Sequence, residues 1–344
     1  MEETKRIPAE WEPYDSVMIA WPHADTDWAS NMEEVTECYE NLAAAIVASD
    51  LNLLIVTPEP NEVKKHIAKL PQERVRLVEV PTNDTWTRDY GPLAMEYAGR
   101  VWALDFQFNG WGLKFASNKD NMVNLRMVEQ GLLTSNYKPM LHFAFEGGSM
   151  EVDGEGTMLT TSECLLSLNR NGVVTKEALC KFFEQAMGIH TMHFLDHGYL
   201  RGDDTDSHID TLARFVSKDT IVYVKCYNPG DEHASELNLM EDELRALRTS
   251  EGNPYNLIAL PLPDAIYDED GERLPATYAN FLITPKTVLM PVYGQTDNDR
   301  LAMQMLRIAF PEREIVAVDC RALIKQHGSL HCATMQLKSE LLRK

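Results

Sequence analysis

The sequence predicts an α/β protein built as a five-unit, pseudo-symmetric α/β propeller, in which repeated hairpin-helix-strand units surround a central axis. Two observations favour this fold. A unit of hairpin, helix and strand recurs four times, and a related fifth piece is divided between the two ends of the chain. Each unit also carries a polar residue at an equivalent point, at intervals of about 50 to 70 residues. Repeats of this size bury their apolar faces against one another, which favours one closed array, 1–344, over two domains.

The divided unit is predicted from hydrophobic runs and their breakers. Apolar runs predict strands at 16–21, 51–57 and 75–80, a helix from about residue 32 and a short helix capped by Asn61 that ends near residue 70. The run 333–337, directly after Cys332, predicts a closing strand at the other end of the chain.

The four complete units follow the same order of elements. The first has strands at 93–97, 101–106 and 140–145, with a helix from about residue 121. The second has strands at 150–152, 157–161 and 191–195, with a helix capped by Thr175. The third has strands at 208–215, 220–226 and 257–260, and the fourth has strands at 280–284, 287–292 and 314–318. Thr296 and Asp299 predict a capping box for the fourth helix, and the long segments 106–118 and 262–277 are expected to be functional loops.

Composition and charge limit the class of function. The chain has 344 residues, with 53 acidic against 32 basic side chains and a net charge of −21. This balance argues against binding of nucleic acid and suits a cationic substrate. No apolar run approaches membrane-spanning length, and the first residues lack the core of a signal peptide. Six scattered cysteines without a Cys-x-x-Cys pair indicate free thiols and a cytoplasmic location.

The polar residues at equivalent points of the units are the candidate site. In a radial array such points meet near the axis, which predicts one cavity that holds Asp89, Glu146, His208, Asp210, Asn280 and Cys332. On the predicted strand 208–215, His208 and Asp210 are two residues apart, so both side chains are expected on the same face. A thiol beside a turn at the start of a strand can be a nucleophile, although a single cysteine is more often part of the packing.

Two alternatives from other classes remain open at this point. The acidic run Asp203, Asp204, Asp206, His208 and Asp210 contains ligand types of hard metals and allows a metal-dependent hydrolase. That alternative leaves Cys332 without a role. An acidic cavity is also what a non-catalytic polyamine-binding protein needs.

Five motifs carry a resemblance to a known family. They are WTRDYGP at 86–92, EGGSMEVDG at 146–154, GDDTDSHIDTLARF at 202–215, LPATYANF at 274–281 and HC at 331–332. In this order they resemble the agmatine deiminases and their bacterial peptidyl-arginine deiminase relatives in the guanidine-modifying superfamily. The resemblance covers nearly the whole chain and implies a five-unit α/β propeller with the active site on its axis. The sequence departs from the family pattern at His327, Gly328 and Ser329, where many members have a glycine run and Asn, and at Ser207, where Gly is frequent.

The resemblance implies a role for each site residue. Cys332 is the nucleophile, His208 the general acid and base, and Glu146 the carboxylate that orients His208. Asp89 and Asp210 hold the substrate guanidinium, and Trp86 and Asn280 line the pocket. The implied reaction is hydrolysis of agmatine to N-carbamoylputrescine and ammonia in polyamine (putrescine) biosynthesis, through a covalent thiouronium intermediate. Free or peptidyl arginine are the alternative substrates.

The resemblance also implies what the protein needs besides its substrate. It requires no metal and no organic cofactor, and its expected partner is the small cationic guanidine substrate alone, without nucleic acid or membrane. A homodimer or a larger homo-oligomer agrees with the family.

Overall fold

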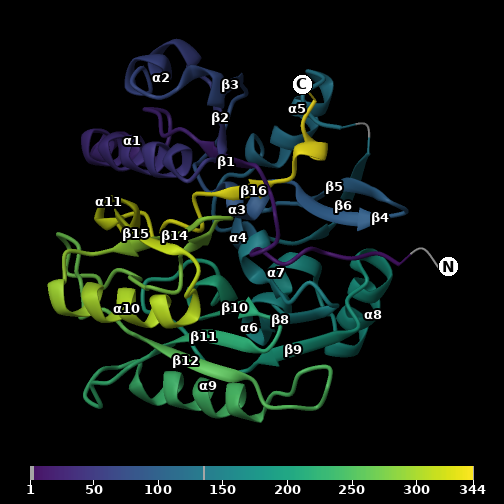
Figure 1. Ribbon diagram of the computed structural model, residues 1–344, viewed down its shortest axis with the longest axis vertical. Coiled ribbons are helices and arrows are strands. Elements are labelled where there is room, and N and C mark those ends of the chain that lie inside the picture. The colour runs from purple at the N-terminus through teal and green to yellow at the C-terminus, as the bar shows by residue number, and fades with distance from the viewer. Residues whose placement is uncertain (1–3, 135, 344) are drawn as a thin grey trace.

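The computed structural model describes residues 4–134 and 136–343. Within these residues the strands form five separate small sheets, each built on the same plan (Figure 1). The sheets are β16-β1-β2-β3 (Met335–Leu337, Ser16–Ala20, Asn52–Thr57, Val75–Glu79), β4-β5-β6 (Leu93–Tyr97, Arg100–Gln107, Tyr137–Ala144), β7-β8-β9 (Glu151–Val152, Thr157–Thr161, Thr191–Leu195), β10-β11-β12 (Ala213–Ser217, Thr220–Lys225, Asn256–Pro261) and β13-β14-β15 (Leu282–Ile283, Thr287–Val292, Glu314–Asp319).

The pairing within each sheet confirms the repeat. The first two strands of every sheet pair antiparallel, and the second and third pair parallel. A parallel pair needs a crossover connection, and here each crossover contains a helix. The sheet β16-β1-β2-β3 joins the two ends of the chain, as the divided fifth unit predicts. The structure is a mixed α/β fold, and closure of the five sheets into a propeller stays a prediction.

The longer helices lie on the outer sides of the sheets in Figure 1. The longer ones are α1 (Met32–Ala48), α8 (Lys176–Met187), α9 (Ala234–Ala246) and α10 (Thr296–Ala309), and the shorter ones are α2 (Pro60–His66), α3 (Thr87–Tyr90), α4 (Gly110–Leu113), α5 (Val123–Glu129), α6 (Ser162–Leu165), α7 (Leu168–Asn171) and α11 (Arg321–Ile324). The apolar positions Val35, Tyr39, Leu42 and Ile46 of α1 are fully buried, in agreement with their helical spacing. One buried apolar cluster includes residues of all five sheets.

The structure corrects several local predictions. Residues 208–212 are not part of a strand, because a 3-10 turn occupies Ile209–Thr211 and β10 begins only at Ala213. The helix α2 begins at Pro60 without an Asn61 cap and ends at His66. The side chain of Thr175 does cap α8, by accepting the Ala178 amide.

The predicted capping box of α10 does not form. Instead the Asp299 carboxylate accepts hydrogen bonds from the Tyr278 hydroxyl at 2.6 Å and the Tyr293 amide at 3.1 Å. The Asp299 carboxylate, which the local sequence assigns to the N-terminus of α10, therefore bonds a buried tyrosine hydroxyl instead.

Candidate active site

The candidate residues lie in the turns that lead into the first strand of each sheet. Asp89 lies in α3 before β4, Glu146 before β7, and Asp210 in the 3-10 turn before β10. Asn280 and Cys332 hold the corresponding positions before β13 and β16. These side chains converge, and all of them are buried.

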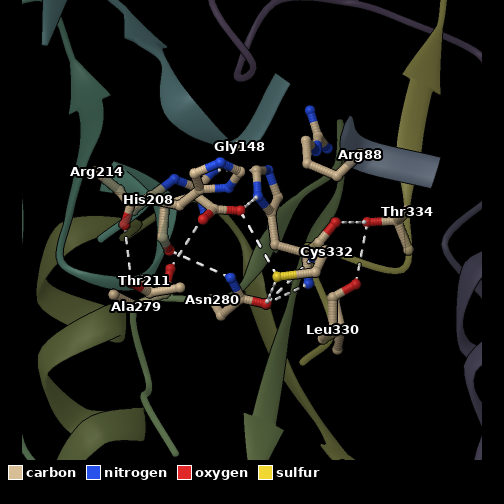
Figure 2. Close-up of polar contacts among 12 residues, drawn as sticks. Arg88, Gly148, His208, Thr211, Arg214, Ala279, Asn280, Leu330, Cys332 and Thr334 are labelled. Atoms are coloured by element: carbon tan, nitrogen blue, oxygen red, sulfur yellow. Dashed lines mark hydrogen bonds and ion pairs between the residues drawn. The ribbon is translucent and has the colours of Figure 1, made fainter. Parts of the chain in front are cut away.

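Cys332 lies against an amide and a carboxylate (Figure 2). Its Sγ is 3.4 Å from Asn280 Oδ1 and 3.9 Å from Asp210 Oδ2, and its backbone amide donates to the same Asn280 oxygen at 3.2 Å. Burial raises the pKa of the Cys332 thiol well above its usual value, and the charges of Asp210 and Asp89 raise this pKa further. The thiol is therefore protonated at neutral pH in the substrate-free site.

His208 lies between two carboxylates without a close hydrogen bond to either. Its Nδ1 is 3.6 Å from Asp89 Oδ1, and its Nε2 is 3.7 Å from Glu146 Oε2. Burial lowers the pKa of His208, but interactions with Asp89, Cys164 and Glu146 outweigh it and raise this pKa well above its usual value. His208 is thus an imidazolium in the substrate-free site, able to give a proton.

Glu146 is held by an arginine that the sequence patterns did not single out. Arg170 Nε donates to Glu146 Oε2 at 2.8 Å and to Oε1 at 3.0 Å, and Arg170 Nη1 bonds Asp206 at 2.5 Å. Burial raises the pKa of Glu146, but the charges of Arg170 and His208 outweigh it and lower this pKa below its usual value. Glu146 is therefore ionised and fixed in orientation beside His208.

Asp89 and Asp210 are both buried but differ in their partners. Asp89 accepts the Gly148 amide and the Trp111 indole N–H, both at 2.9 Å. Burial and the charges of Asp210 and Glu146 raise the pKa of Asp89, against the lowering effect of His208. Burial also raises the pKa of Asp210, but its bond to His331 outweighs this and leaves that pKa lowered. Asp210 Oδ1 is buried without a hydrogen-bond partner.

His331 connects Asp210 to a buried ionic network. Its Nδ1 is 2.8 Å from Asp210 Oδ2, and its Nε2 is 2.7 Å from Glu10 Oε2. Arg214 Nη2 bonds the same Glu10 oxygen at 2.8 Å, and Arg214 Nε bonds Glu151. Arg214 Nη2 is also 3.0 Å from His331 Nε2, so the guanidinium, the imidazole and the Glu10 carboxylate meet at one point. The HC motif contains His331 and the motif at 202–215 contains Arg214, whereas Glu10 lies outside all five motifs.

A cavity opens over Cys332. Its walls include Trp86, Asp89, Trp111 and Phe115, and five aspartates line it: Asp27, Asp84, Asp89, Asp203 and Asp204. No lysine or arginine occurs among the described residues that line it. Trp86 packs on Gly328 so closely that a Cβ on Gly328 would lie 2.4 Å from the indole ring.

The two predicted functional loops differ in their relation to this cavity. Segment 106–118 contributes Trp111 and Phe115 to the wall, whereas no residue of 262–277 lines it. Segment 262–277 packs elsewhere: Arg273 pairs with Asp231, and Leu274 is buried.

The acidic run 203–210 does not form the metal site that the alternative interpretation requires. Asp206 pairs with Arg170 and Lys114, and Asp203 accepts the Thr205 hydroxyl and the Ser207 amide. Among the described residues, the three-donor groups with converging ligand atoms are Glu146-Cys164-His208 and Glu10-Glu151-His331. Neither group draws on the aspartates of the run.

Comparisons with known proteins agree with this geometry. A family described as Porphyromonas-type peptidyl-arginine deiminase matches residues 6–337. A Shewanella baltica protein named "Putative agmatine deiminase" is 31% identical, with 97% of this chain and 94% of the relative covered.

Solved structures extend the comparison to the fold. A Porphyromonas gingivalis structure described as a "Putative Arginine Deiminase" is 44% identical, covers 98% of this chain and 100% of its own, and superimposes with a TM-score of 0.92. A cysteine-to-serine variant of C. jejuni agmatine deiminase with substrate bound is 34% identical, covers 99% of this chain and 98% of its own, and has a TM-score of 0.91.

Proposed function

Because the chain belongs to the family of Porphyromonas-type peptidyl-arginine deiminases, we propose that it hydrolyses agmatine to N-carbamoylputrescine and ammonia. The general class of activity, hydrolysis of a guanidine C–N bond, follows from the family. The observation that carries the specific proposal is a buried thiol flanked by two carboxylates at the base of an acidic cavity. A guanidinium is planar and cationic, and paired carboxylates can hold it in the plane that exposes its central carbon.

Binding of the substrate guanidinium brings a positive charge next to Asp89, Asp210 and Cys332. Asp89 and Asp210 would accept N–H bonds from the guanidinium, and the unpartnered Asp210 Oδ1 is free to do so. The arriving cation offsets the two carboxylates that raise the pKa of Cys332, so the thiol gives its proton to solvent and the thiolate forms at neutral pH. Asn280, through its bonds to the backbone and Sγ of Cys332, holds the nucleophile in place.

The reaction then proceeds in two halves. The Cys332 thiolate attacks the guanidinium carbon, His208 gives its proton to the leaving nitrogen, and ammonia departs to leave an S-alkylthiouronium. Neutral His208 next takes a proton from water, which attacks the same carbon, and the Cys332–carbon bond breaks to release the carbamoyl product. Glu146, fixed by Arg170, stabilises the imidazolium in both halves.

The cavity wall favours agmatine over free arginine. Agmatine carries an ammonium at its far end, which suits the aspartates of the wall. Free arginine carries an α-carboxylate there, and the described wall offers it no lysine or arginine. Peptidyl arginine is the second candidate, supported by the family description and by the identity to the P. gingivalis protein.

An ammonia-release assay tests the proposal directly. We expect the largest kcat/KM for agmatine among agmatine, free arginine and an arginine peptide. Cys332→Ser should reduce turnover by at least about 10³-fold, because a hydroxyl is a far weaker nucleophile than a thiolate. Near-normal turnover by this variant would exclude the mechanism, and preference for the peptide would move the assignment to the second candidate.

The proposal extends to the metabolic role, the location and the domain structure of the protein. We propose a role in putrescine formation in the cytoplasm and closure of the five sheets around the site as a single propeller domain. No helix in the described residues combines the length and apolarity required to cross a bilayer.

A further inference from the structure

A second buried thiol lies beside the active site, and the proposed mechanism does not use it. Cys164 is in α6, directly after β8, where Thr161 caps the helix by accepting the Cys164 amide. Its side chain is fully buried, and its Sγ is 4.0 Å from Glu146 Oε2. Cys164 therefore approaches Glu146 and His208 within the protein, while Cys332 lines the substrate cavity.

The donor atoms of Glu146, Cys164 and His208 converge on one point. One ligand atom from each lies within 4.8 Å of the other two, and His208 Nε2 is 3.7 Å from Glu146 Oε2. A tetrahedral zinc ion bound at about 2.0–2.3 Å separates its nitrogen, oxygen and sulfur donors by roughly 3.3–3.6 Å. The His208–Glu146 spacing of 3.7 Å and the Cys164–Glu146 spacing of 4.0 Å are close to these values, and the Cys164–His208 spacing is within 4.8 Å. Rotation of the three side chains toward a shared ion would shorten all three spacings.

His208 supplies an independent indication of a missing ligand. Its Nε2 is buried and has no hydrogen-bond partner, although it points toward Glu146 and Cys164. Buried ring nitrogens are normally bonded, and this one faces a carboxylate and a thiol. Thiolate, imidazole and carboxylate together are ligands typical of zinc rather than of magnesium or calcium.

The positive charge of Arg170 limits which ions can bind between Glu146, Cys164 and His208. Arg170 already bonds both oxygens of Glu146, so a cation here must gain most of its affinity from the sulfur and the nitrogen. That requirement excludes hard cations and selects soft ones. Zinc binding displaces the Cys164 proton and the His208 proton to solvent and forms one Zn–S and one Zn–N bond.

We propose that Glu146, Cys164 and His208 form an inhibitory site for Zn²⁺ or a similarly soft divalent cation. A bound ion occupies the Nε2 of His208 and one oxygen of Glu146, which removes the acid-base pair from catalysis. This inhibition rests on the proposed deiminase function, whereas the metal site itself does not.

Cobalt binding tests the site without any need for turnover. Co²⁺ replaces Zn²⁺ in tetrahedral sites, and its bond to a thiolate gives a sulfur-to-metal charge-transfer band. In Cys332→Ser, which removes the nucleophilic thiol as a competing ligand, we expect about one equivalent of Co²⁺ with this band. The band should disappear in the double variant Cys164→Ser/Cys332→Ser and persist in the control Cys180→Ser/Cys332→Ser, which changes a partly exposed cysteine of α8. Absence of the band in Cys332→Ser, or its persistence in the double variant with Cys164→Ser, overturns the proposal.

Inhibition provides the second readout. Micromolar Zn²⁺ should reduce ammonia release from agmatine, and a chelator should restore it. Cys164→Ser should retain activity within about threefold and require at least tenfold more Zn²⁺ for half-inhibition; Cys164→Ala serves if the serine variant folds poorly. Equal zinc sensitivity in both folded enzymes contradicts the assignment. If no guanidine substrate releases ammonia, the proposed function fails while the cobalt result still decides the metal site.

Discussion

Gly148 occupies a position where a side chain would collide with three functional groups at once. A Cβ at this residue would lie 2.6 Å from His208 Nδ1, 2.8 Å from Asp89 Oδ1 and 3.2 Å from Asp210 Oδ2. Ordinary contact begins near 3.4 Å, so Gly148→Ala displaces the imidazole by about 0.8 Å (3.4 − 2.6) and the Asp89 carboxylate by about 0.6 Å (3.4 − 2.8). Neither group can retreat freely, because both are buried and Asp89 is fixed by Trp111.

A displacement near 1 Å in a reacting group costs about 10²-fold in rate, and overpacking of a buried site costs about 1–3 kcal/mol of stability. We therefore expect Gly148→Ala to lower kcat/KM for ammonia release by at least about 100-fold, with a modest loss of thermal stability. Gly230→Ala is the control, since its Cβ would have no contact shorter than 3.4 Å. Gly148→Ala activity within threefold of the parent, with unchanged thermal unfolding, would refute the close packing of these three groups.

Three further predictions concern charge. The pKa of Cys332 is raised well above 9, so the reactive thiolate fraction should grow about tenfold per pH unit between pH 7 and 9. Iodoacetamide alkylation of the substrate-free enzyme, followed by mass spectrometry, should accelerate by the same factor. An alkylation rate independent of pH in this range contradicts the raised pKa. His331→Gln removes an imidazole that bonds both Asp210 and Glu10 and so fixes the Asp210 carboxylate. We therefore expect kcat/KM to fall by at least tenfold with a raised KM. The control His233→Gln breaks a similar bond to Asp231 and should change stability without changing KM. Asp89→Asn and Asp210→Asn should both abolish turnover but differ in urea unfolding at pH 7. The folded-state pKa of Asp89 is raised and that of Asp210 is lowered. A lowered carboxyl pKa stabilises the folded protein above the unfolded pKa of about 3.9, and this stability is lost as pH falls through the folded pKa. Only Asp210→Asn should therefore lower the free energy of unfolding at pH 7 through this effect.

The five sheets could be predicted because their signals are local. Apolar runs, glycine turns and helix periodicity recur in each unit, and the antiparallel-then-parallel pairing confirms the resulting order of elements. The convergence of Asp89, Glu146, Asn280 and Cys332 followed from the same recurrence, since each precedes the first strand of its sheet. A position within a repeat thus predicted spatial proximity without any contact being visible in the sequence.

The predicted relation between His208 and Asp210 had the right outcome for the wrong reason. We expected strand alternation to place both side chains on one face, but the backbone there is a 3-10 turn. Both side chains still lie beside Gly148, since a Cβ there would be 2.6 Å from His208 Nδ1 and 3.2 Å from Asp210 Oδ2. Ile209 between His208 and Asp210 imitates the alternation of a strand, and the turn leads directly into β10, so periodicity alone extended the strand too far.

The supporting network was outside the reach of sequence patterns. Arg214 bonds Glu10 across 204 positions of the chain, and His331 bonds Glu10 across 321. Neither pair belongs to one helix or one hairpin, where spacing rules apply. The bond between Arg170 and Glu146 is also not indicated by local sequence, because Arg170 lies in a short helix whose own sequence indicates only a solvated turn.

The electrostatics of the empty site links substrate selection to activation of the nucleophile. The Cys332 thiol is protonated because burial, Asp210 and Asp89 all oppose a second negative charge in the same small space. A guanidinium held by these aspartates offsets the opposing charge at the moment it brings its carbon to the sulfur. A neutral isostere of the guanidinium, such as a ureido group, can fill the same volume but leaves the thiol protonated. Discrimination against neutral groups therefore arises in the rate of attack as well as in binding, and an acidic site with a raised thiol pKa stays unreactive until its cationic substrate arrives.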